Sequence, residues 1–298
     1  MKIPRFSLGS WAFSFGPFES DPWDFDRFLA YAAKAGYDGV EINGFQPHPH
    51  PDDYATDGAC APLKARLDEL GLGISGYAPD FRSVPPAEVA PEAYLAELEK
   101  ILAFCGRMGI RTLRVDSVSP PVALPSGEYE ERFERLSLTW RAAAARAAQD
   151  GVTIVWEFEP GFWLNKPSEV RALVDAVDHP AFRLLFDTSH AHMGAAISAR
   201  QTGEPERLPG GAAAYAEQLR DVIGHVHLID CDGTLHDEET STHSPFGTGD
   251  VDFPAVLSAL RPIWDDLTWV CFDFCFCPTT EVDAVKAIPY VRQLLQAQ

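Results

Sequence analysis

Acidic and imidazole side chains stand at the ends of four short apolar runs in the second half of the chain. The runs span residues 151–159, 182–187, 222–230 and 267–274. The groups they carry are Glu157 with Glu159, then Asp187, then His225 with His227, and finally Asp273. Carboxylates and imidazoles are ligands of divalent metals that prefer nitrogen and oxygen, such as Mn²⁺, Co²⁺, Zn²⁺ or Mg²⁺. One such residue alone is more often a hydrogen-bonded strand end, but four in succession favour a metal site.

Short apolar runs separated by helical patterns are typical of parallel strands covered by helices. Within residues 152–159 the side chains alternate between two faces, so Val155, Glu157 and Glu159 share one face. The carboxyl ends of parallel strands meet at one edge of a sheet. Glu157 or Glu159 at the end of one strand and Asp187 at the end of the next are therefore expected to converge.

The first half of the chain alternates in the same way between strand-like and helical patterns. The predicted strands there are residues 6–13, 37–43, 72–78 and 110–116. The predicted helices of the chain include residues 24–36, 61–71, 91–108, 129–150 and 282–295.

Three motifs resemble those of a known family. Residues 151–158 read Gly-Val-Thr-Ile-Val-Trp-Glu-Phe, residues 187–192 read Asp-Thr-Ser-His-Ala-His, and residues 225–228 read His-Val-His-Leu. They are similar to strands five, six and seven of the xylose isomerase-like barrels. That superfamily of sugar phosphate isomerases and epimerases also includes inosose dehydratases and endonuclease IV, of the AP endonuclease family 2 type. The resemblance covers nearly the whole chain and implies a single (β/α)₈ TIM barrel over residues 1–298, which suits the about 250 residues of such barrels.

The resemblance also implies a site. The resemblance implies that the site binds one divalent metal ion, with Mn²⁺ favoured over Co²⁺, Mg²⁺ and Zn²⁺. The implied metal ligands are Glu157, Asp187, His227 and Asp273. The candidate catalytic residues are Glu157, Glu159, His190 and Asp273, and the candidate substrate-binding residues are Glu41, His192, His243 and Trp11. Glu157 and Glu159 share a face, so either could be the ligand; the spacing from Gly151 favours Glu157.

The expected reaction is proton removal alpha to the carbonyl of a sugar or polyol, through an enediolate, as in a metal-dependent isomerase or epimerase. In the epimerases two glutamates work on opposite faces of the substrate, whereas Asp273 stands here where glutamate is usual. The shorter side chain favours a single base. A metal-dependent lyase on a keto sugar or inosose, of dehydratase or C-glycoside deglycosidase type, is the alternative. A non-catalytic carbohydrate-binding subunit is a remote third.

Charge and composition limit the classes of binding partner that we expect. The net charge is −20, from 44 acidic against 24 basic residues, which argues against nucleic acid and so against a nuclease. No apolar run approaches the about 20 residues of a membrane span, and the first residues lack a secretion signal. We therefore expect a cytoplasmic protein with no membrane partner and a small sugar or polyol as substrate. The sequence leaves open whether the chain forms a homo-oligomer or binds a partner subunit. The six cysteines favour buried thiols over a zinc site.

Two irregular segments, residues 192–212 and 230–252, follow predicted barrel strands and are expected on the active-site face. A third loop alternates proline with His48 and His50. We favour a solvated turn for it over a substrate lid.

Overall fold

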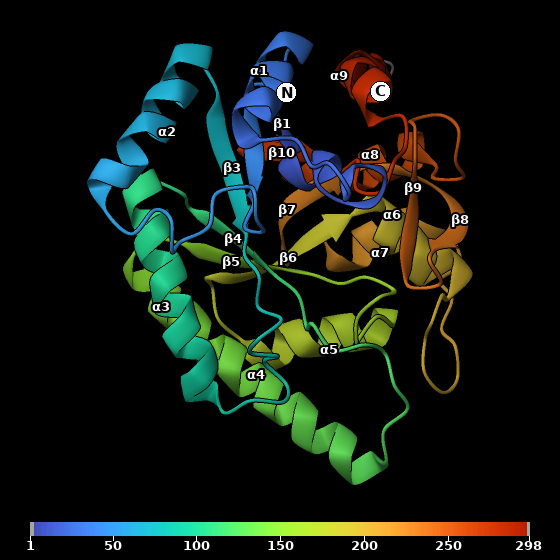
Figure 1. Ribbon diagram of the computed structural model, residues 1–298. Coiled ribbons are helices and arrows are strands. Elements are labelled where there is room, and N and C mark those ends of the chain that lie inside the picture. Colours follow the sequence, from blue (N-terminus) through green and yellow to red (C-terminus); the bar gives the residue numbers. More distant parts are fainter. Residues whose placement is uncertain (1–2, 297–298) are drawn as a thin grey trace.

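Eight parallel strands close into a barrel, which confirms the predicted (β/α)₈ fold (Figure 1). The structure is a computed structural model and describes residues 3–296. The strands follow one another around the barrel in the order β1-β10-β7-β6-β5-β4-β3-β2. They are β1 (Arg5–Gly9), β2 (Gly39–Asn43), β3 (Gly73–Ala78), β4 (Thr112–Val115), β5 (Thr153–Glu157), β6 (Phe182–Asp187), β7 (Ile223–Leu228) and β10 (Trp269–Phe272).

Helices pack around the outside of the barrel (Figure 1). They are α1 (Phe25–Ala35), α2 (Asp57–Leu70), α3 (Pro91–Met108), α4 (Ser126–Gln149), α5 (Pro167–Val177), α6 (Thr188–His192), α7 (Gly211–Leu219), α8 (Phe253–Leu260) and α9 (Thr280–Gln296). Helix α1 shows why the boundaries fall where they do. Asp24 accepts a hydrogen bond from the Arg27 amide at its start, and Gly36 ends it in the left-handed region at φ 87°. Within residues 3–296, no helix combines the length and apolarity that crossing a bilayer requires.

The barrel closes where β1 pairs with β10, from Arg5 opposite Trp269 to Leu8 opposite Phe272. Tight packing at this seam depends on a glycine in the neighbouring strand. A Cβ on Gly39 would lie 2.5 Å from the Trp269 ring and 2.5 Å from the carbonyl oxygen of Gly73. Only glycine therefore fits at this position without displacing the backbone of β3.

The first predicted strand is shorter than expected. It ends at Gly9, and residues Ser10–Phe13 form a 3₁₀ turn, so Trp11 lies above the strand end instead of within the strand. The segment after β7 is also more regular than expected. It contains an antiparallel hairpin, β8 (Asp230–His236) and β9 (Thr240–Ser244), outside the closed barrel. In the other insertion, α6 continues as a π-helical turn over Met193–Ile197.

The expectation of a solvated turn around His48 is wrong, because His48 is only 1% exposed. Its Nε2 lies 3.0 Å from the Trp23 carbonyl oxygen, to which it donates, and its Nδ1 lies 3.0 Å from Ser10 Oγ. Ser10 Oγ in turn accepts from the Asn43 amide. The imidazole therefore joins the loop after β2 to the turn after β1.

Candidate metal centre and active-site pocket

Four residues from adjacent strands converge at the carboxyl end of the barrel. Each of Glu157, Asp187, His227 and Asp273 offers a ligand atom, and these atoms lie within 4.8 Å of one another. The pairing explains the convergence, because Asp187 stands opposite His227 and His227 opposite Cys271, two residues before Asp273. Glu157 ends the neighbouring strand β5. The structure thus groups Glu157, and not Glu159, with the other three.

The cluster contains buried polar atoms that have no hydrogen-bond partner among residues 3–296. They are Glu157 Oε1, Asp187 Oδ2 and His227 Nδ1, although His227 Nδ1 lies only 3.0 Å from Glu157 Oε1. The second oxygen of Asp187 is occupied, since Oδ1 accepts from the amides of Ser189 and His190. Buried polar atoms normally have partners, and three oxygen ligands with one imidazole suit a divalent cation. The residues present therefore fit the expected metal.

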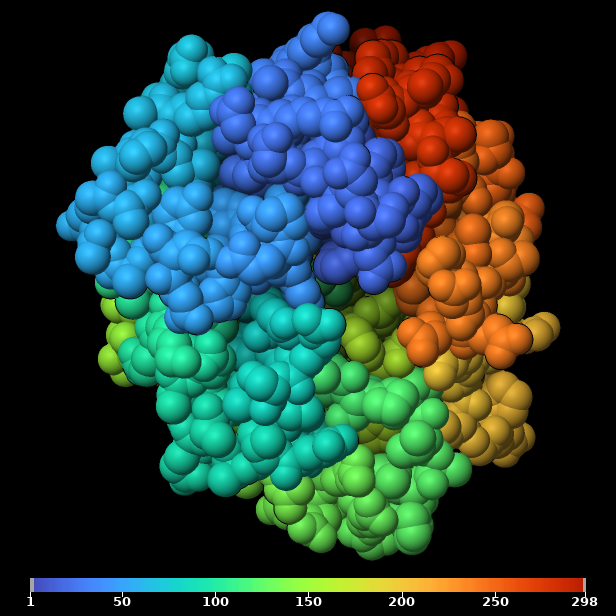
Figure 2. Space-filling view, in the orientation of Figure 1, coloured from blue at the N-terminus to red at the C-terminus, as the bar shows by residue number. Residues whose placement is uncertain are grey.

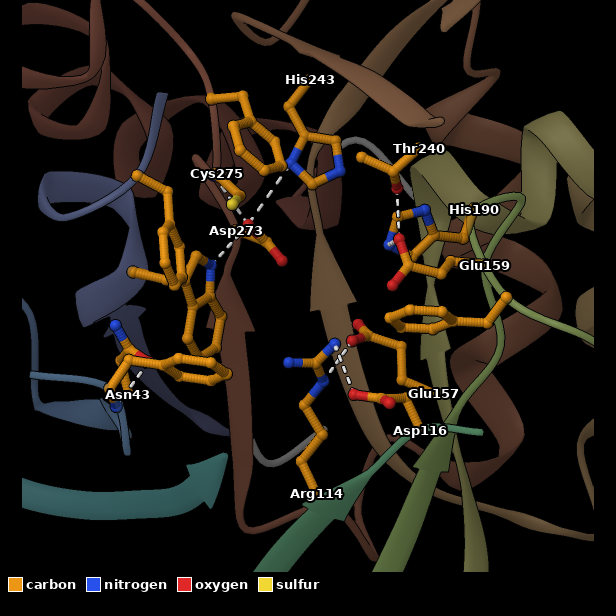
Figure 3. Close-up of a pocket in the computed structure, with 15 residues that line it drawn as sticks. Asn43, Arg114, Asp116, Glu157, Glu159, His190, Thr240, His243, Asp273 and Cys275 are labelled. Atoms are coloured by element: carbon orange, nitrogen blue, oxygen red, sulfur yellow. Dashed lines mark hydrogen bonds and ion pairs between the residues drawn. The ribbon is translucent and has the colours of Figure 1, made fainter. Parts of the chain in front are cut away.

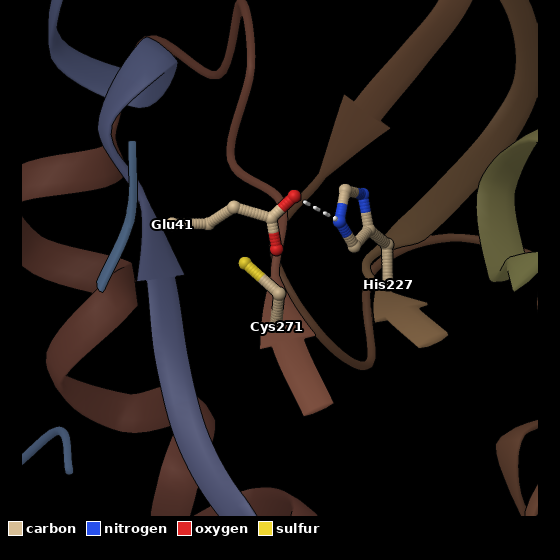
Figure 4. Close-up of side chains that lie close together, drawn as sticks. All are labelled: Glu41, His227 and Cys271. Carbon is tan, nitrogen blue, oxygen red and sulfur yellow. Dashed lines mark hydrogen bonds and ion pairs between the residues drawn. The ribbon is translucent and has the colours of Figure 1, made fainter. Parts of the chain in front are cut away.

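A buried carboxylate holds the histidine ligand from behind (Figure 4). Glu41 is fully buried, and its Oε1 lies 3.3 Å from His227 Nε2, while its Oε2 lies 2.7 Å from His225 Nε2. With Nε2 donating to Glu41, Nδ1 of His227 faces the cluster, where a cation that displaces its proton can take the lone pair. Burial alone would lower the pKa of His227, but the Glu41 and Glu157 carboxylates raise it well above its usual range.

Glu41 was predicted to bind substrate, and that role stays a prediction. The carboxylate lies beneath His227 and does not line the pocket. Cys271 completes a second group with Glu41 and His227. Burial raises the pKa of the Cys271 thiol well above its usual range, and both oxygens of Glu41 already accept from imidazoles. Cys271 is accordingly a buried thiol, as predicted for the cysteines.

Asp273 is anchored from two sides. The indole nitrogen of Trp11 donates to its Oδ1 at 2.6 Å, and the Cys275 amide donates to the same oxygen at 2.8 Å. Its other oxygen lies 3.6 Å from His227 Nδ1. The Trp11 ring also packs against His227, with 5.3 Å between centroids. Trp11, predicted to bind substrate, therefore lines the pocket and positions a candidate ligand as well.

A positively charged side chain, Arg114, lies beside the ligand cluster. The Arg114 guanidinium forms an ion pair with Glu157 and lies 3.9 Å from Asp116 Oδ2 (Figure 3). Burial alone would raise the pKa of Glu157, but Arg114 and His227 lower it to about 2. Burial raises the pKa of Asp187 to about 7, and the Asp273 and Glu157 carboxylates add to that shift while His243 opposes it.

Glu159 and His190 form a second polar group at the pocket wall (Figure 3). Glu159 Oε2 lies 3.8 Å from His190 Nε2 and accepts a hydrogen bond from Thr240. His190 Nδ1 lies 2.8 Å from Ser241 Oγ. Burial raises the pKa of Glu159 to about 8, with repulsion from Glu157 in the same direction and Arg114 opposing. Burial lowers the pKa of His190 to about 3.

The hairpin contributes a third imidazole. His243, on β9, is 5% exposed, and neither of its ring nitrogens has a hydrogen-bond partner in the described part of the chain, although Nδ1 lies 3.3 Å from Asp273 Oδ1. It lines the pocket, where it was predicted to bind substrate. Its Nε2, which no described residue contacts by a hydrogen bond or an ion pair, can therefore contact a bound molecule.

A cavity of about 170 Å³ lies at the carboxyl end of the barrel. Two of the candidate ligands, Glu157 and Asp273, line it together with Glu159, His190 and His243, whereas Asp187 and His227 are not among its lining residues. A hollow near the middle of the molecule opens between segments from distant parts of the chain (Figure 2). His192 does not line this cavity, and its predicted role in substrate binding stays a prediction. Helix α6 begins directly after Asp187, and residues two apart on a helix point in different directions. His190 therefore faces the pocket while His192 turns away from it.

Sequence reasoning did not single out Arg114, Thr240 or Ser241. Arg114 carried a usable signal, because a charged side chain between Leu113 and Val115 interrupts a buried strand. Thr240 and Ser241 carried none, since their hairpin was predicted as irregular.

The chain belongs to the xylose isomerase-like TIM barrel family, whose model matches residues 29–282. Among curated proteins, it resembles an inosose dehydratase of Clostridium botulinum (strain Alaska E43 / Type E3). The two are 24% identical over 172 residues, which is 56% of this chain and 54% of that protein. The match thus spans about half the length of that relative.

Solved structures share the fold over nearly their whole length. A D-tagatose 3-epimerase-like protein superposes with a TM-score of 0.72 at 19% identity, covering 98% of this chain and 97% of the other. The probable 3-DHS dehydratase of Bacillus anthracis gives a TM-score of 0.71 at 16% identity, covering 97% and 98%. The IOLI protein with a binding zinc atom gives 0.68 at 16% identity, covering 98% and 96%.

Proposed function

We propose that this chain is a divalent-metal-dependent isomerase or epimerase of a sugar or polyol. It would act by removing a proton alpha to a carbonyl, through an enediolate. One observation carries the proposal: atoms of Glu157, Asp187 and His227 that lack hydrogen bonds lie close together beside Asp273. Glu157 and Asp273 also line a pocket that holds further acid–base groups. Relatives of the same fold named as epimerases support it.

The expected cofactor is one divalent metal, Mn²⁺ in the first place and otherwise Co²⁺, Mg²⁺ or Zn²⁺. Glu157, Asp187, His227 and Asp273 would hold it. When bound, it would polarise the substrate carbonyl and stabilise the negative charge of the enediolate. The relative solved with a zinc atom supports this assignment.

The chain's own residues would remove the proton and orient the substrate. Glu159 lines the pocket outside the ligand cluster, so its carboxylate is positioned to take the proton from the carbon next to the carbonyl. His190, 3.8 Å from Glu159, is placed to orient a substrate hydroxyl. Arg114 keeps Glu157 ionised through their ion pair. The buried walls limit the access of water to the reacting carbon.

Proton–deuterium exchange followed by NMR tests this proposal. Keto sugars and inososes would be incubated in D₂O with metal-loaded and metal-free protein. We expect exchange at one carbon, in the metal-loaded protein only. Glu159→Gln should slow the exchange by about 10²–10⁴-fold at unchanged metal content. Glu217→Gln, on the exposed side of α7, is the control. Absence of exchange across the whole panel would contradict the proposal.

The role of Asp273 separates one-base from two-base chemistry. Its Oδ1 already accepts from Trp11 and Cys275, which favours a positioned ligand over a second base. Asp273→Asn keeps an oxygen ligand but removes the basic group, so exchange should survive in the one-base model. Loss of exchange with metal still bound at the wild-type ratio would instead support two bases.

The same observation on Asp273 favours a second candidate, a lyase. With one base, proton removal can be followed by loss of a substituent from the β carbon. The electron pair of the C–H bond forms the new double bond, and the leaving group departs with its electrons and is protonated. Relatives named as dehydratases support this reaction. An unsaturated ketone accumulating in the exchange experiment would identify it.

Two further readings are less well supported. A DNA-repair nuclease would need a basic surface, whereas the chain has a net charge of −20. We expect no retention on heparin at about 0.15 M salt. A non-catalytic carbohydrate-binding subunit would not need four converging ligands, and protein purified without metal would favour it.

A further inference from the structure

The pocket has two chemically different halves. Its base is polar and includes two of the four candidate ligands, Glu157 and Asp273, together with Glu159, His190 and His243. Its mouth is lined by four phenylalanines, here called the aromatic collar: Phe15, Phe45, Phe162 and Phe276. The four rings belong to four separate loops, which follow β1, β2, β5 and β10. They are partly exposed, although His236 covers one face of Phe276 and Arg82 lies over the Phe45 ring.

Three rings of the collar form a continuous apolar wall. The ring centroids of Phe15 and Phe45 are 5.5 Å apart, and those of Phe15 and Phe276 are 6.3 Å apart. His236 of the hairpin stacks on Phe276 at 4.3 Å with an interplanar angle of 18°. Such a wall offers planar contacts that a sugar hydroxyl cannot use.

Phe276 occupies its place at the mouth in an unfavourable backbone conformation. Its φ is 60°, in the left-handed region that bulky residues rarely adopt. Gly16 packs against it, and a Cβ on Gly16 would lie 3.0 Å from the Phe276 ring and 3.1 Å from its Cα. The surrounding structure thus holds the ring at the mouth despite the backbone cost, which is typical of functional positions.

The collar is also the place where three cavities meet. Phe276 and Thr240 line a neighbouring cavity of about 340 Å³, and Phe15 and Phe45 line another of about 390 Å³. A substrate held at the base of the pocket therefore has room beyond the collar for a substituent.

The charges at the mouth disfavour an anionic substituent. Among the described residues that line these three cavities, the arginines are Arg114 and Arg82, and there is no lysine. Arg114 pairs with Glu157, and Arg82 pairs with Asp80 at 2.7 Å. Glu19, Asp237 and Glu239 add negative charge. A phosphate or carboxylate would find no arginine or lysine free of a carboxylate partner there.

We propose that the substrate is a keto sugar or keto polyol carrying an aryl substituent. Its polar ring would lie over the ligand cluster and its aryl group against the aromatic collar. The inference rests on the proposed function and adds the substrate class to it. Phe15 and Phe276 are then residues that determine specificity.

A matched pair of ligands tests the proposal. Phenyl and methyl β-D-glucopyranoside would be titrated into metal-loaded protein by calorimetry, as unreactive probes. Their 3-keto derivatives would be compared by kcat/KM for proton–deuterium exchange. We expect the phenyl compound to be favoured at least about tenfold in both measurements. In Phe276→Ala and Phe15→Ala the phenyl-to-methyl ratio should fall below about threefold. Val282→Ala, which removes an exposed apolar side chain outside the pocket, should keep the wild-type ratio.

The outcomes separate this proposal from the proposed function. Equal values for the two compounds, or a preference that persists in both collar variants, would overturn the aryl substrate while exchange itself upholds the function. If neither keto compound exchanges but the phenyl probe still binds tighter through the collar, aryl recognition stands and the proposed reaction fails.

Discussion

Each candidate ligand is held by a residue or backbone group that leaves one of its atoms facing the cluster. Trp11 and the Cys275 amide occupy one oxygen of Asp273, and Glu41 occupies Nε2 of His227. The amides at the start of α6 occupy one oxygen of Asp187. This arrangement lowers the reorganisation needed when a cation binds.

Asp187→Asn tests the cluster directly. The amide oxygen can still cap α6, but the charge of the ligand is lost. We expect metal loss on dialysis, with the unfolding free energy of the metal-free protein within about 1 kcal/mol of wild type because the cap is kept. Elemental analysis and urea unfolding measure the two effects. Asp175→Asn, on the exposed surface of α5, should retain metal. Wild-type metal content in Asp187→Asn would exclude it as a ligand.

Glu41→Gln tests the support behind the histidine. A neutral amide holds the His227 imidazole less strongly, so metal affinity should fall by about 10–100-fold. Competition with a chelator measures this affinity. Glu69→Gln, at the exposed end of α2, is the matched control. Unchanged affinity would show that Glu41 does not act through His227.

The residues that sequence reasoning located and those it missed differ in what fixes their position. Glu157, Asp187, His227 and Asp273 lie at or beside strand ends, where alternation and the order of strands suffice to bring them together. Glu41 and His227 come from β2 and β7, which are not neighbours in the barrel, so their contact depends on its closure and radius. The orientation of His192 depends on α6, a short helix that begins directly after Asp187 and that the sequence pattern did not predict.

At the scale of elements, the β8–β9 hairpin completes a site that the barrel begins. It supplies Thr240 to Glu159, Ser241 to His190 and His243 to the wall beside Asp273. Its two strands pair only with each other, outside the barrel. The hairpin can therefore shape the pocket without contributing to closure of the barrel.

Ser241→Ala should lower the exchange rate about fivefold, the effect of losing one hydrogen bond to His190. Metal content and melting temperature should stay at wild-type values, since the change lies outside the barrel. Thr242→Ala is a close control, because the side chain of this next residue of β9 hydrogen-bonds to Thr234 within the hairpin and not to His190. Equal rates in both variants would remove Ser241 as a positioning residue.

We expect the free energy of unfolding to depend on pH through His48, in the loop after β2. Burial lowers the pKa of His48 from 6.5 to about 4, while the Trp23 carbonyl and Asp24 oppose the shift. Between these values the unfolded chain binds the proton and the folded chain does not, so stability falls as pH decreases from 6.5 towards 4. The loss of folding stability from this histidine between pH 6.5 and 4 is about 3 kcal/mol. Urea unfolding should show a shallower pH dependence in His48→Gln, and the wild-type dependence in His50→Gln. The same slope in all three proteins would contradict this assignment.

At the scale of the whole molecule, closure ties the first strand to the last. Strand β1 pairs with both β2 and β10, so neither end of the sheet can separate without breaking the barrel. We therefore propose that the chain is a single domain that unfolds in one cooperative transition. Thermal melts followed by far-UV circular dichroism and by tryptophan fluorescence should coincide. Two separated transitions would indicate independent units.

The placement of the aromatic collar on loops has a consequence for how such a protein can change over evolutionary time. The candidate metal ligands stand at strand ends or next to them, where a displaced backbone would disturb the barrel. Phe15, Phe45, Phe162 and Phe276 stand on connections that tolerate insertion and replacement. Selection can thus exchange the group that is recognised at the mouth while the reacting end is inherited unchanged. A variant library designed to find new substrates should therefore randomise residues in these four loops.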